Sequence, residues 1–305
     1  MIADKVFMVR PARFRFNPET AANNAFQQPV EESPSTIQNI ARTEFDALVN
    51  LMRKHNIEVD VWEDDGKEDR PDAIFPNNWF STHPGHMLVT YPMFSPARRR
   101  ERVAAFIQHI VHRYQVLSHL SLEYFESIDK YLEGTGSLVI DHEYGLVYAN
   151  RSPRTDPVPF QRFCQLLGYT PVLFEAADSR GIPVYHTNVV MGIGRGYILI
   201  NRSAVATEDW TRLEFYFQQS GKTILEIDED QMNQFVANVA FLNNRAHKPY
   251  IVMSESAYNA LYSNQKKKLL HFGTIIHSDI STIEKVGGGS VKCMIAENYL
   301  SHRKR

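Results

Sequence analysis

Short apolar segments separated by polar motifs follow one another along the whole chain. Residues 6–9 and 58–62 have the continuous or alternating apolar pattern of strands, and residues 35–55 between them carry apolar side chains near helical spacing. Pro11 ends the first strand, because proline has no N–H group to donate to a sheet. The pattern therefore predicts a strand, a helix and a second strand at the start of the chain.

The same order of segments then recurs. A polar motif leads into two short apolar strands joined by a turn, and a helical pattern follows at residues 159–167, 207–219 and 256–269. Further strands, such as residues 172–174, precede the polar motifs. The interval between equivalent polar positions is roughly 50–58 residues, a spacing typical of repeat architectures. These positions are Asn78, Gly136, Asn188, Asn238 and Ser290.

Each repeat is predicted to contain a strand, a polar motif, a hairpin and a helix, which places the chain in the α/β fold class. The last repeat lacks a helix, and the N-terminal segment could supply the missing partner. Five units in an open array would leave apolar ends uncovered, and closing them into a ring removes that problem. No linker rich in Gly, Pro or Ser divides the chain, so residues 1–305 are predicted to form a single domain.

Composition restricts the partners more than the fold. Hydrophobic residues make up 43% and charged residues 22% of the chain, and the net charge of −2 gives no reason to expect a nucleic-acid or membrane partner. The sequence has no signal-peptide pattern and no apolar run of membrane-spanning length. Its two cysteines do not make a disulfide framework. We therefore expect a soluble cytoplasmic protein, with homodimerisation left open.

Cys293 follows three consecutive glycines and is predicted to lie on a short C-terminal strand. A glycine run lets a ligand approach the main chain closely, so a thiol just beyond it could be a reactive nucleophile. The alternative is a buried structural cysteine. Partners for the thiol elsewhere in the chain would decide between the two.

Ring closure would gather the polar motifs, and with them the residue types that thiol chemistry needs. A thiol is mostly protonated at neutral pH, because its unperturbed pKa is roughly 8.5. An imidazole can protonate a leaving amine and then activate water, and a carboxylate can orient the imidazole or hold the nitrogens of the reacting group. The candidates are Cys293, His186, Glu133, Asn77, Asn78 and Asn188.

Each candidate also has a structural interpretation. His186 could be a core histidine, and Glu133 before a Gly-Thr-Gly segment could close a turn. Asn188 and Asn238 could be turn residues whose side chains bond the nearby backbone. Cys164 lies on the apolar stripe of a predicted helix and is interpreted as core.

Other polar features do not complete a known motif. His83 and His86 lie near a hairpin turn, but no carboxylate or thiol completes a metal site. The glycines of residues 192–196 lie between two predicted strands, so they do not form a dinucleotide-binding loop. The arginines at 98–100 follow Pro96 on a predicted helix and are interpreted as a solvated face.

Several short motifs together carry a family resemblance. They are MVRP at residues 8–11, FNPET at 16–20, NNAFQ at 23–27, FPNNWFSTH at 75–83, EGTGS at 133–137, SPRT at 152–155, HTNV at 186–189 and GGGSVKC at 287–293. The chain resembles the pentein, or guanidino-group-modifying, superfamily, which includes arginine deiminases, dimethylarginine dimethylaminohydrolases and amidinotransferases. It is most similar to a bacterial branch described as citrulline hydrolases, often labelled amidinotransferase-like or arginine-deiminase-related.

The resemblance implies a five-bladed α/β-propeller, in agreement with the repeats. It also implies a covalent mechanism with Cys293 as nucleophile, His186 as acid and base, and Glu133 as the carboxylate. The thiol would attack the central carbon of a guanidino or ureido group and expel an amine or ammonia. No metal or organic cofactor is expected, and the expected partner is a small amino-acid substrate.

Two asparagines depart from the pattern of deiminases, in which aspartate is usual at the positions of Asn78 and Asn188. Two carboxylates suit a guanidinium, which is cationic and offers only hydrogen-bond donors. A ureido group is neutral and has a carbonyl acceptor beside its N–H donors, and asparagine can complement both. The departure therefore favours citrulline, hydrolysed to ornithine, over arginine as substrate.

The remaining assignments are less specific. Arg154 could clamp the substrate α-carboxylate or be a solvated arginine, and Asp72 could contact the substrate amine or support a neighbour. Phe75, in the same motif, is also a candidate for substrate binding. The alternatives are an amidinotransferase, arginine deiminase or dimethylarginine hydrolase with the same triad, and a non-catalytic pentein binding protein. A papain-like protease is disfavoured because it would usually place its cysteine before its histidine.

Overall fold

The computed structural model describes residues 2–303 of the chain. In this part of the chain the strands form five separate three-stranded sheets, and none of the sheets closes on itself. In every sheet the middle strand pairs antiparallel with one neighbour and parallel with the other. The fold is therefore a mixed α/β structure built from five copies of one small sheet.

Each sheet consists of an antiparallel outer strand, a middle strand and a parallel outer strand, in that order. The sheets are β15 (Ala296–Glu297), β1 (Lys5–Arg10) and β2 (Glu58–Glu63); β3 (Phe80–His83), β4 (Met87–Thr90) and β5 (Ser118–Ser121); β6 (Val139–Asp141), β7 (Leu146–Asn150) and β8 (Thr170–Phe174); β9 (Met191–Ile193), β10 (Tyr197–Ile200) and β11 (Thr223–Glu226); β12 (Ala240–Asn243), β13 (Pro249–Ser254) and β14 (Thr274–Ser278).

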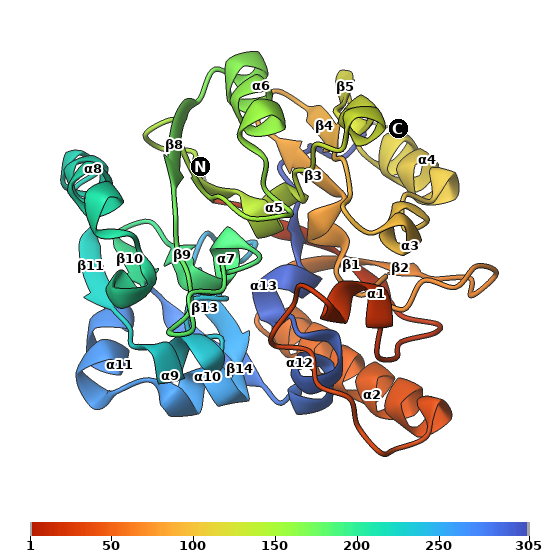
Figure 1. Cartoon of the computed structure of the whole chain (residues 1–305). Coiled ribbons are helices and arrows are strands. Elements are labelled where there is room, and N and C mark those ends of the chain that lie inside the picture. Colours follow the sequence, from red (N-terminus) through yellow and green to blue (C-terminus); the bar gives the residue numbers. More distant parts are fainter. Residues whose placement is uncertain (1, 304–305) are drawn as a thin grey trace.

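Helices connect each middle strand to its parallel neighbour, and Figure 1 shows them on the outside of the molecule. These connecting helices are α2 (Pro34–Lys54), α3 (Pro96–Arg99), α4 (Ala104–Arg113), α6 (Pro157–Leu167), α8 (Thr207–Gln219), α10 (Glu255–Ala260) and α11 (Ser263–Leu269). The remaining helices are α1 (Pro18–Ala21), α5 (Gly134–Ser137), α7 (Thr187–Val190), α9 (Glu229–Asn233), α12 (Ser281–Gly287), α13 (Val291–Met294) and the 3-10 helices η1 (Pro76–Asn78), η2 (Glu123–Ile128) and η3 (Arg202–Ala204).

The sequence repeats are confirmed as these sheets, but their internal boundaries differ from the prediction. The strand placed before each polar motif pairs with the preceding hairpin, as β8 does with β7, so it closes the previous unit. The N-terminal segment does complete the last unit, because β1 pairs with β15 through Val6 opposite Glu297. The predicted helix 256–269 is two helices, α10 and α11.

Local sequence explains the longest helix, α2. The Ser33 side chain caps its start by accepting a hydrogen bond from the Thr36 N–H, and Pro34 occupies the first turn. Its buried side chains, among them Phe45 and Leu48, recur at helical spacing and pack against β14 and α12. Arg53 lies in the last turn, where a positive charge is favourable.

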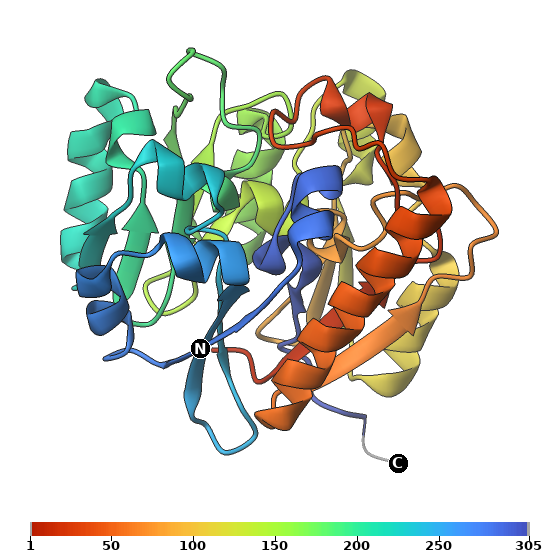
Figure 2. The same cartoon turned by 90° about the horizontal axis from the view of Figure 1, so that it is seen from below.

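Several short helical turns lie in the middle of the molecule rather than on its outside. Figure 1 shows α5, α7 and α13 near the centre, and Figure 2 shows α1 and the N-terminal loop on the same side of the molecule as α12 and α13. These turns begin at the polar motifs of the repeats. The fold thus gathers motifs that are distant in sequence. No helix among residues 2–303 has the length and apolar character required to cross a membrane.

Candidate active site

The polar motifs form helical turns where strands had been predicted. Glu133 and His186 directly precede α5 and α7, and Cys293 lies within α13, not on a strand. The turns approach one another closely because their motifs contain glycine. Gly134 has a φ of +45°, and a Cβ there would lie 2.1 Å from the backbone oxygen of Asn77. Gly134, the first glycine of the EGTGS motif, is therefore needed for α5 to pack against η1.

The Cys293 thiol is buried between two asparagine amides. Its Sγ lies 3.3 Å from Nδ2 of Asn238 and 3.5 Å from Nδ2 of Asn188, and both nitrogens can donate to sulfur. Burial raises the pKa of the Cys293 thiol above its ordinary value, although these donors act in the opposite direction. The resting thiol is therefore protonated at neutral pH.

His186 and Glu133 form a buried pair. The His186 Nε2 lies 2.8 Å from Oε2 of Glu133. Burial alone would raise the pKa of the Glu133 carboxyl, but Arg154 and the hydrogen bond from His186 lower it to about 2. Burial lowers the pKa of His186 to about 4, even though Glu133 favours the protonated ring. At neutral pH a neutral imidazole thus donates its Nε2 proton to a carboxylate, which leaves Nδ1 free to accept a proton.

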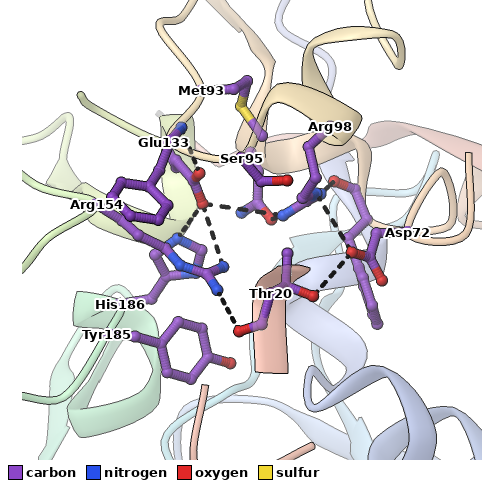
Figure 3. A network of polar contacts seen from close by, with 12 residues as sticks. Thr20, Asp72, Met93, Ser95, Arg98, Glu133, Arg154, Tyr185 and His186 are labelled. Atoms are coloured by element: carbon purple, nitrogen blue, oxygen red, sulfur yellow. Dashed lines mark hydrogen bonds and ion pairs between the residues drawn. The ribbon is translucent and has the colours of Figure 1, made fainter. Parts of the chain in front are cut away.

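Two buried arginines flank this pair, and Figure 3 shows both directed toward Glu133. Arg154 Nη1 lies 3.4 Å and Arg98 Nη1 lies 3.9 Å from Oε2 of Glu133. Arg154 is 2% exposed, stacks over the ring of Tyr185 and donates from Nε to Asn23 at 2.9 Å. Arg154 is therefore buried, so the interpretation of it as a solvated arginine is wrong.

A small pocket lies beside these side chains. Its cavity volume is about 10 Å³, which is room for roughly one water molecule. The residues lining it are Thr20, Asn24, Asp72, Phe75, Asn78, Arg98, Arg154, Tyr185, His186, Gly287, Gly288, Gly289 and Cys293. An amino-acid ligand would therefore need this pocket to open before it could reach the thiol.

The N-terminal loop covers the pocket and is held by the glycine run. Asn24 donates to the backbone oxygen of Gly288 at 3.1 Å, and Gln27 donates to that of Val286 at 3.2 Å. A Cβ on Gly287 would lie 2.7 Å from the ring of Phe75. The glycines thus make room for this ring and the covering loop.

The other predicted substrate contacts differ in position. Asn78 and Asp72 line the pocket, whereas Asn188 contacts the sulfur and is not among the lining residues. Asp72 accepts a hydrogen bond from Asn17 at 2.7 Å through Oδ2, while its buried Oδ1 has no protein partner. Substrate contact by these residues stays a prediction.

Sequence reasoning missed several residues near the thiol: Thr20, Asn24, Arg98 and Tyr185 line the pocket, and Asn238 contacts the sulfur. Arg98 had been interpreted as part of a solvated face, but it is 3% exposed and lines the pocket. Glu101, three positions further on, accepts two of its hydrogen bonds, and this spacing was the available signal. Asn238 was aligned with the polar positions of the other repeats but was interpreted as a turn residue, and that alignment was the available signal for its contact with the thiol.

The structure also locates the sequence features that were not assigned to the site, namely Cys164, His83 and the glycines of residues 192–196. Cys164 is 1% exposed in the core, and burial raises its thiol pKa to about 12. His83 is buried, and no cluster of potential metal ligands is found among residues 2–303. Gly194 lies in the turn between strands β9 and β10, and a dinucleotide-binding loop would instead lead from a strand into a helix.

Repeated small sheets around a central thiol, imidazole and carboxylate place the protein in the pentein superfamily of guanidino-group-modifying enzymes. The chain belongs to the family described as N,N dimethylarginine dimethylhydrolase, eukaryotic, which it matches over residues 10–300. No curated protein is significantly similar to it in sequence.

Solved structures support the same fold. Apo ArgZ, an arginine dihydrolase from the ornithine-ammonia cycle in Cyanobacteria, is 17% identical over 96% of this chain with a TM-score of 0.73, and this chain covers 40% of ArgZ. The N-terminal domain of ArgZ, as a cysteine-to-serine variant bound to substrate, is 17% identical with a TM-score of 0.73, and 95% of this chain covers 96% of it. A histidine-to-glycine variant of dimethylarginine dimethylaminohydrolase, in an adduct with S-methyl-L-thiocitrulline, is 15% identical with a TM-score of 0.66, and 98% of this chain covers all of it.

Replacing Gly136 by alanine is expected to lower turnover at least about 100-fold, because positioning errors near reacting groups are costly. The new Cβ would lie 2.4 Å from Asn78 Nδ2 and 2.7 Å from His186 Nδ1. Steady-state kinetics of the variant test this. Gly145→Ala is the control, since it adds a Cβ in open space at a φ of +66° and should reduce thermal stability but not turnover. Equal turnover of Gly136→Ala and wild type would contradict the proposed packing.

Alkylation of Cys293 by iodoacetamide is expected to accelerate about tenfold per pH unit from about pH 6 to 8.5, because the raised pKa leaves little thiolate in this range. Mass spectrometry of the labelled, ligand-free protein gives the rates. Cys293→Ser should remove the labelling. A plateau in the neutral range would mean that the resting thiol is ionised, against the burial argument.

Proposed function

We propose that the protein is a cysteine-dependent hydrolase of the neutral ureido group, converting citrulline to ornithine, ammonia and carbon dioxide. The observation that carries the proposal is the side-chain amide of Asn78, whose buried Nδ2 has no protein partner and which lines the thiol pocket. This N–H group can donate to a carbonyl oxygen. A ureido group offers such an acceptor next to its carbon, whereas a guanidinium offers only donors.

The charges around the pocket match the two ends of an amino acid. Arg98 and Arg154 are both in its lining, each beside a buried carboxylate, and Asp72 is the lining carboxylate. The α-carboxylate of an amino acid would be attracted to Arg154, and its α-ammonium group could bind the free Oδ1 of Asp72.

The proposed first step forms a bond between Cys293 Sγ and the ureido carbon. The thiol proton passes to the free nitrogen of His186, whose Nε2–H stays bonded to Glu133. The C–N bond then breaks, and the same proton leaves with ammonia or the amine. The product of this step is a carbamoyl thioester on Cys293.

In the second step His186 removes a proton from water, which attacks the thioester carbon. The C–S bond breaks, the proton returns to the sulfur, and the carbamic acid released decomposes to carbon dioxide and to whichever of ammonia and amine did not leave in the first step. One water molecule is consumed for each citrulline. Glu133 stabilises the transient imidazolium in both steps.

The five sheets are proposed to act as blades of one closed ring in a single domain, which would bring the three catalytic groups together from distant repeats.

The second candidate function is hydrolysis of a methylated arginine, and the family match over residues 10–300 favours it. The same triad would serve this reaction, so the two candidates differ in the head group alone.

Product analysis tests the proposed function. Citrulline labelled with carbon-13 in its ureido group should yield labelled carbon dioxide and unlabelled ornithine, without any added amine. A requirement for an acceptor amine would indicate an amidinotransferase instead. Release of methylamine or dimethylamine from methylated arginine, with citrulline unchanged, would support the second candidate.

A further inference from the structure

Arg98 makes contacts that the proposed catalytic steps do not use. Its Nη1 donates to Oδ1 of Asn78 at 2.7 Å, and its Nε and Nη2 donate to the two carboxylate oxygens of Glu101 at 2.8 and 2.9 Å. All three side chains are buried. Burial disfavours the charge of Arg98, but Glu101 outweighs this effect and keeps the pKa of Arg98 above its ordinary value. The guanidinium is therefore a permanent donor.

These contacts decide which way the Asn78 amide faces. A guanidinium has no acceptor, so the side of Asn78 that meets Arg98 must be its oxygen. The nitrogen then faces away from Arg98, where it lies without a protein partner against Gly136 and close to His186. Turning the amide over would set N–H against N–H at Arg98 and leave the oxygen toward the pocket.

We propose that Arg98, clamped by Glu101, is a positioning residue that makes Asn78 a pure hydrogen-bond donor and thereby selects ureido over guanidino substrates. The inference rests on the proposed hydrolysis of citrulline and deepens it. In this arrangement the ureido oxygen accepts from Asn78. An arginine substrate would place an N–H group at the same point, where two donors oppose each other.

The contacts of Arg98, which lies on α3, hold its side chain in one position. Arg98 also donates to the backbone oxygen of Phe75 at 3.3 Å, and its Nε lies 3.8 Å from Oδ2 of Asp72, as Figure 3 shows in part. With Asn78, Glu101 and Glu133, five groups therefore surround one guanidinium plane. Its neighbour Arg99 instead bonds the backbone of Met93 and a carboxylate of Glu126, away from the pocket.

The test compares Arg98→Met with wild type on citrulline and arginine. Methionine cannot donate, so the Asn78 amide becomes free to present its oxygen. The ratio of kcat/KM for citrulline to that for arginine should fall roughly 10- to 100-fold. Both substrates share the same amino-acid end, so any loss of carboxylate binding cancels in this ratio. Arg99→Met is the matched control and should leave the ratio unchanged.

A second variant guards against misfolding of Arg98→Met. Asn78→Asp keeps an oxygen for Arg98 and replaces the donor with an acceptor, so its ratio should also fall at least about tenfold. Burial raises the pKa of Glu101 to about 7, which lets this carboxyl take up a proton when Arg98 is removed and favours folding of the methionine variant. An unchanged ratio in whichever of the two variants folds overturns the proposal.

A binding measurement separates this proposal from the proposed function. Calorimetry in the Cys293→Ala background compares citrulline and arginine without turnover. If wild type does not hydrolyse citrulline, the function fails. The positioning role still stands if Cys293→Ala prefers citrulline and the added Arg98→Met change removes that preference. The positioning role is overturned if the double variant, Cys293→Ala with Arg98→Met, still binds citrulline more tightly than arginine.

Discussion

Replacing Cys293 by alanine is expected to lower turnover roughly 10⁴-fold or more, the largest effect of any single change in this chain. The sulfur forms the covalent bond to the substrate carbon in the proposed mechanism, and no second thiol is among the residues that line the pocket. Asn188 and Asn238, which contact the sulfur, are amides and cannot take its place. Steady-state release of ornithine measures the loss.

The matched control for this change is Cys164→Ala. Cys164 is buried in another part of the molecule and has no hydrogen bond to the site, so its removal should affect thermal stability but leave turnover near the wild-type value. Intact-mass spectrometry during turnover adds an independent observation, because only proteins that retain Cys293 should show a carbamoyl adduct. Substantial turnover by Cys293→Ala would refute the covalent mechanism.

Replacing Glu133 by glutamine is expected to lower kcat about 10³- to 10⁴-fold while leaving the fold intact. The carboxylate fixes the Nε2–H tautomer of His186 through the 2.8 Å contact and stabilises the imidazolium that forms during each step. It also faces Arg98 and Arg154; in the variant Arg98 keeps Glu101 as a counter-ion, whereas Arg154 loses the carboxylate that lies 3.4 Å away. The pKa of His186 should fall further below about 4, because the Glu133 charge raises it in the wild type.

Kinetics and thermal unfolding distinguish this effect from general damage. Glu143→Gln, which neutralises an exposed carboxylate on the neighbouring hairpin, should behave as wild type. A Glu133→Gln variant that loses only substrate affinity, with kcat preserved, would assign the carboxylate to binding and remove it from the proton-transfer steps.

The elements of the fold could be predicted because their signals are local. The pattern of residues 207–219 coincides with α8, and the five polar motifs indicated five repeated units. The sequence did not predict which hairpin each third strand pairs with, because the residues of a short apolar strand do not specify its partner strand. The parallel pairing of β8 with β7 depends on the helix between them.

The site was predictable where a residue type had one chemical use. Cys293, His186 and Glu133 were selected because thiol chemistry needs these three types. The fold places Cys293 and His186 in the lining of one pocket, and Glu133 lies 2.8 Å from His186. Arg98 was missed because arginines after a proline on a short helix are usually exposed. Its burial results from contacts with Glu101 and Asn78, and the latter lies 20 positions away in sequence.

Side-by-side values of kcat/KM for citrulline, arginine and asymmetric dimethylarginine test the central claim most directly. All three substrates share the amino-acid end and differ in the head group presented to Cys293. A neutral carbonyl-bearing group should be preferred to the two cations by at least about 100-fold. A higher value for arginine or dimethylarginine than for citrulline would contradict the proposed specificity.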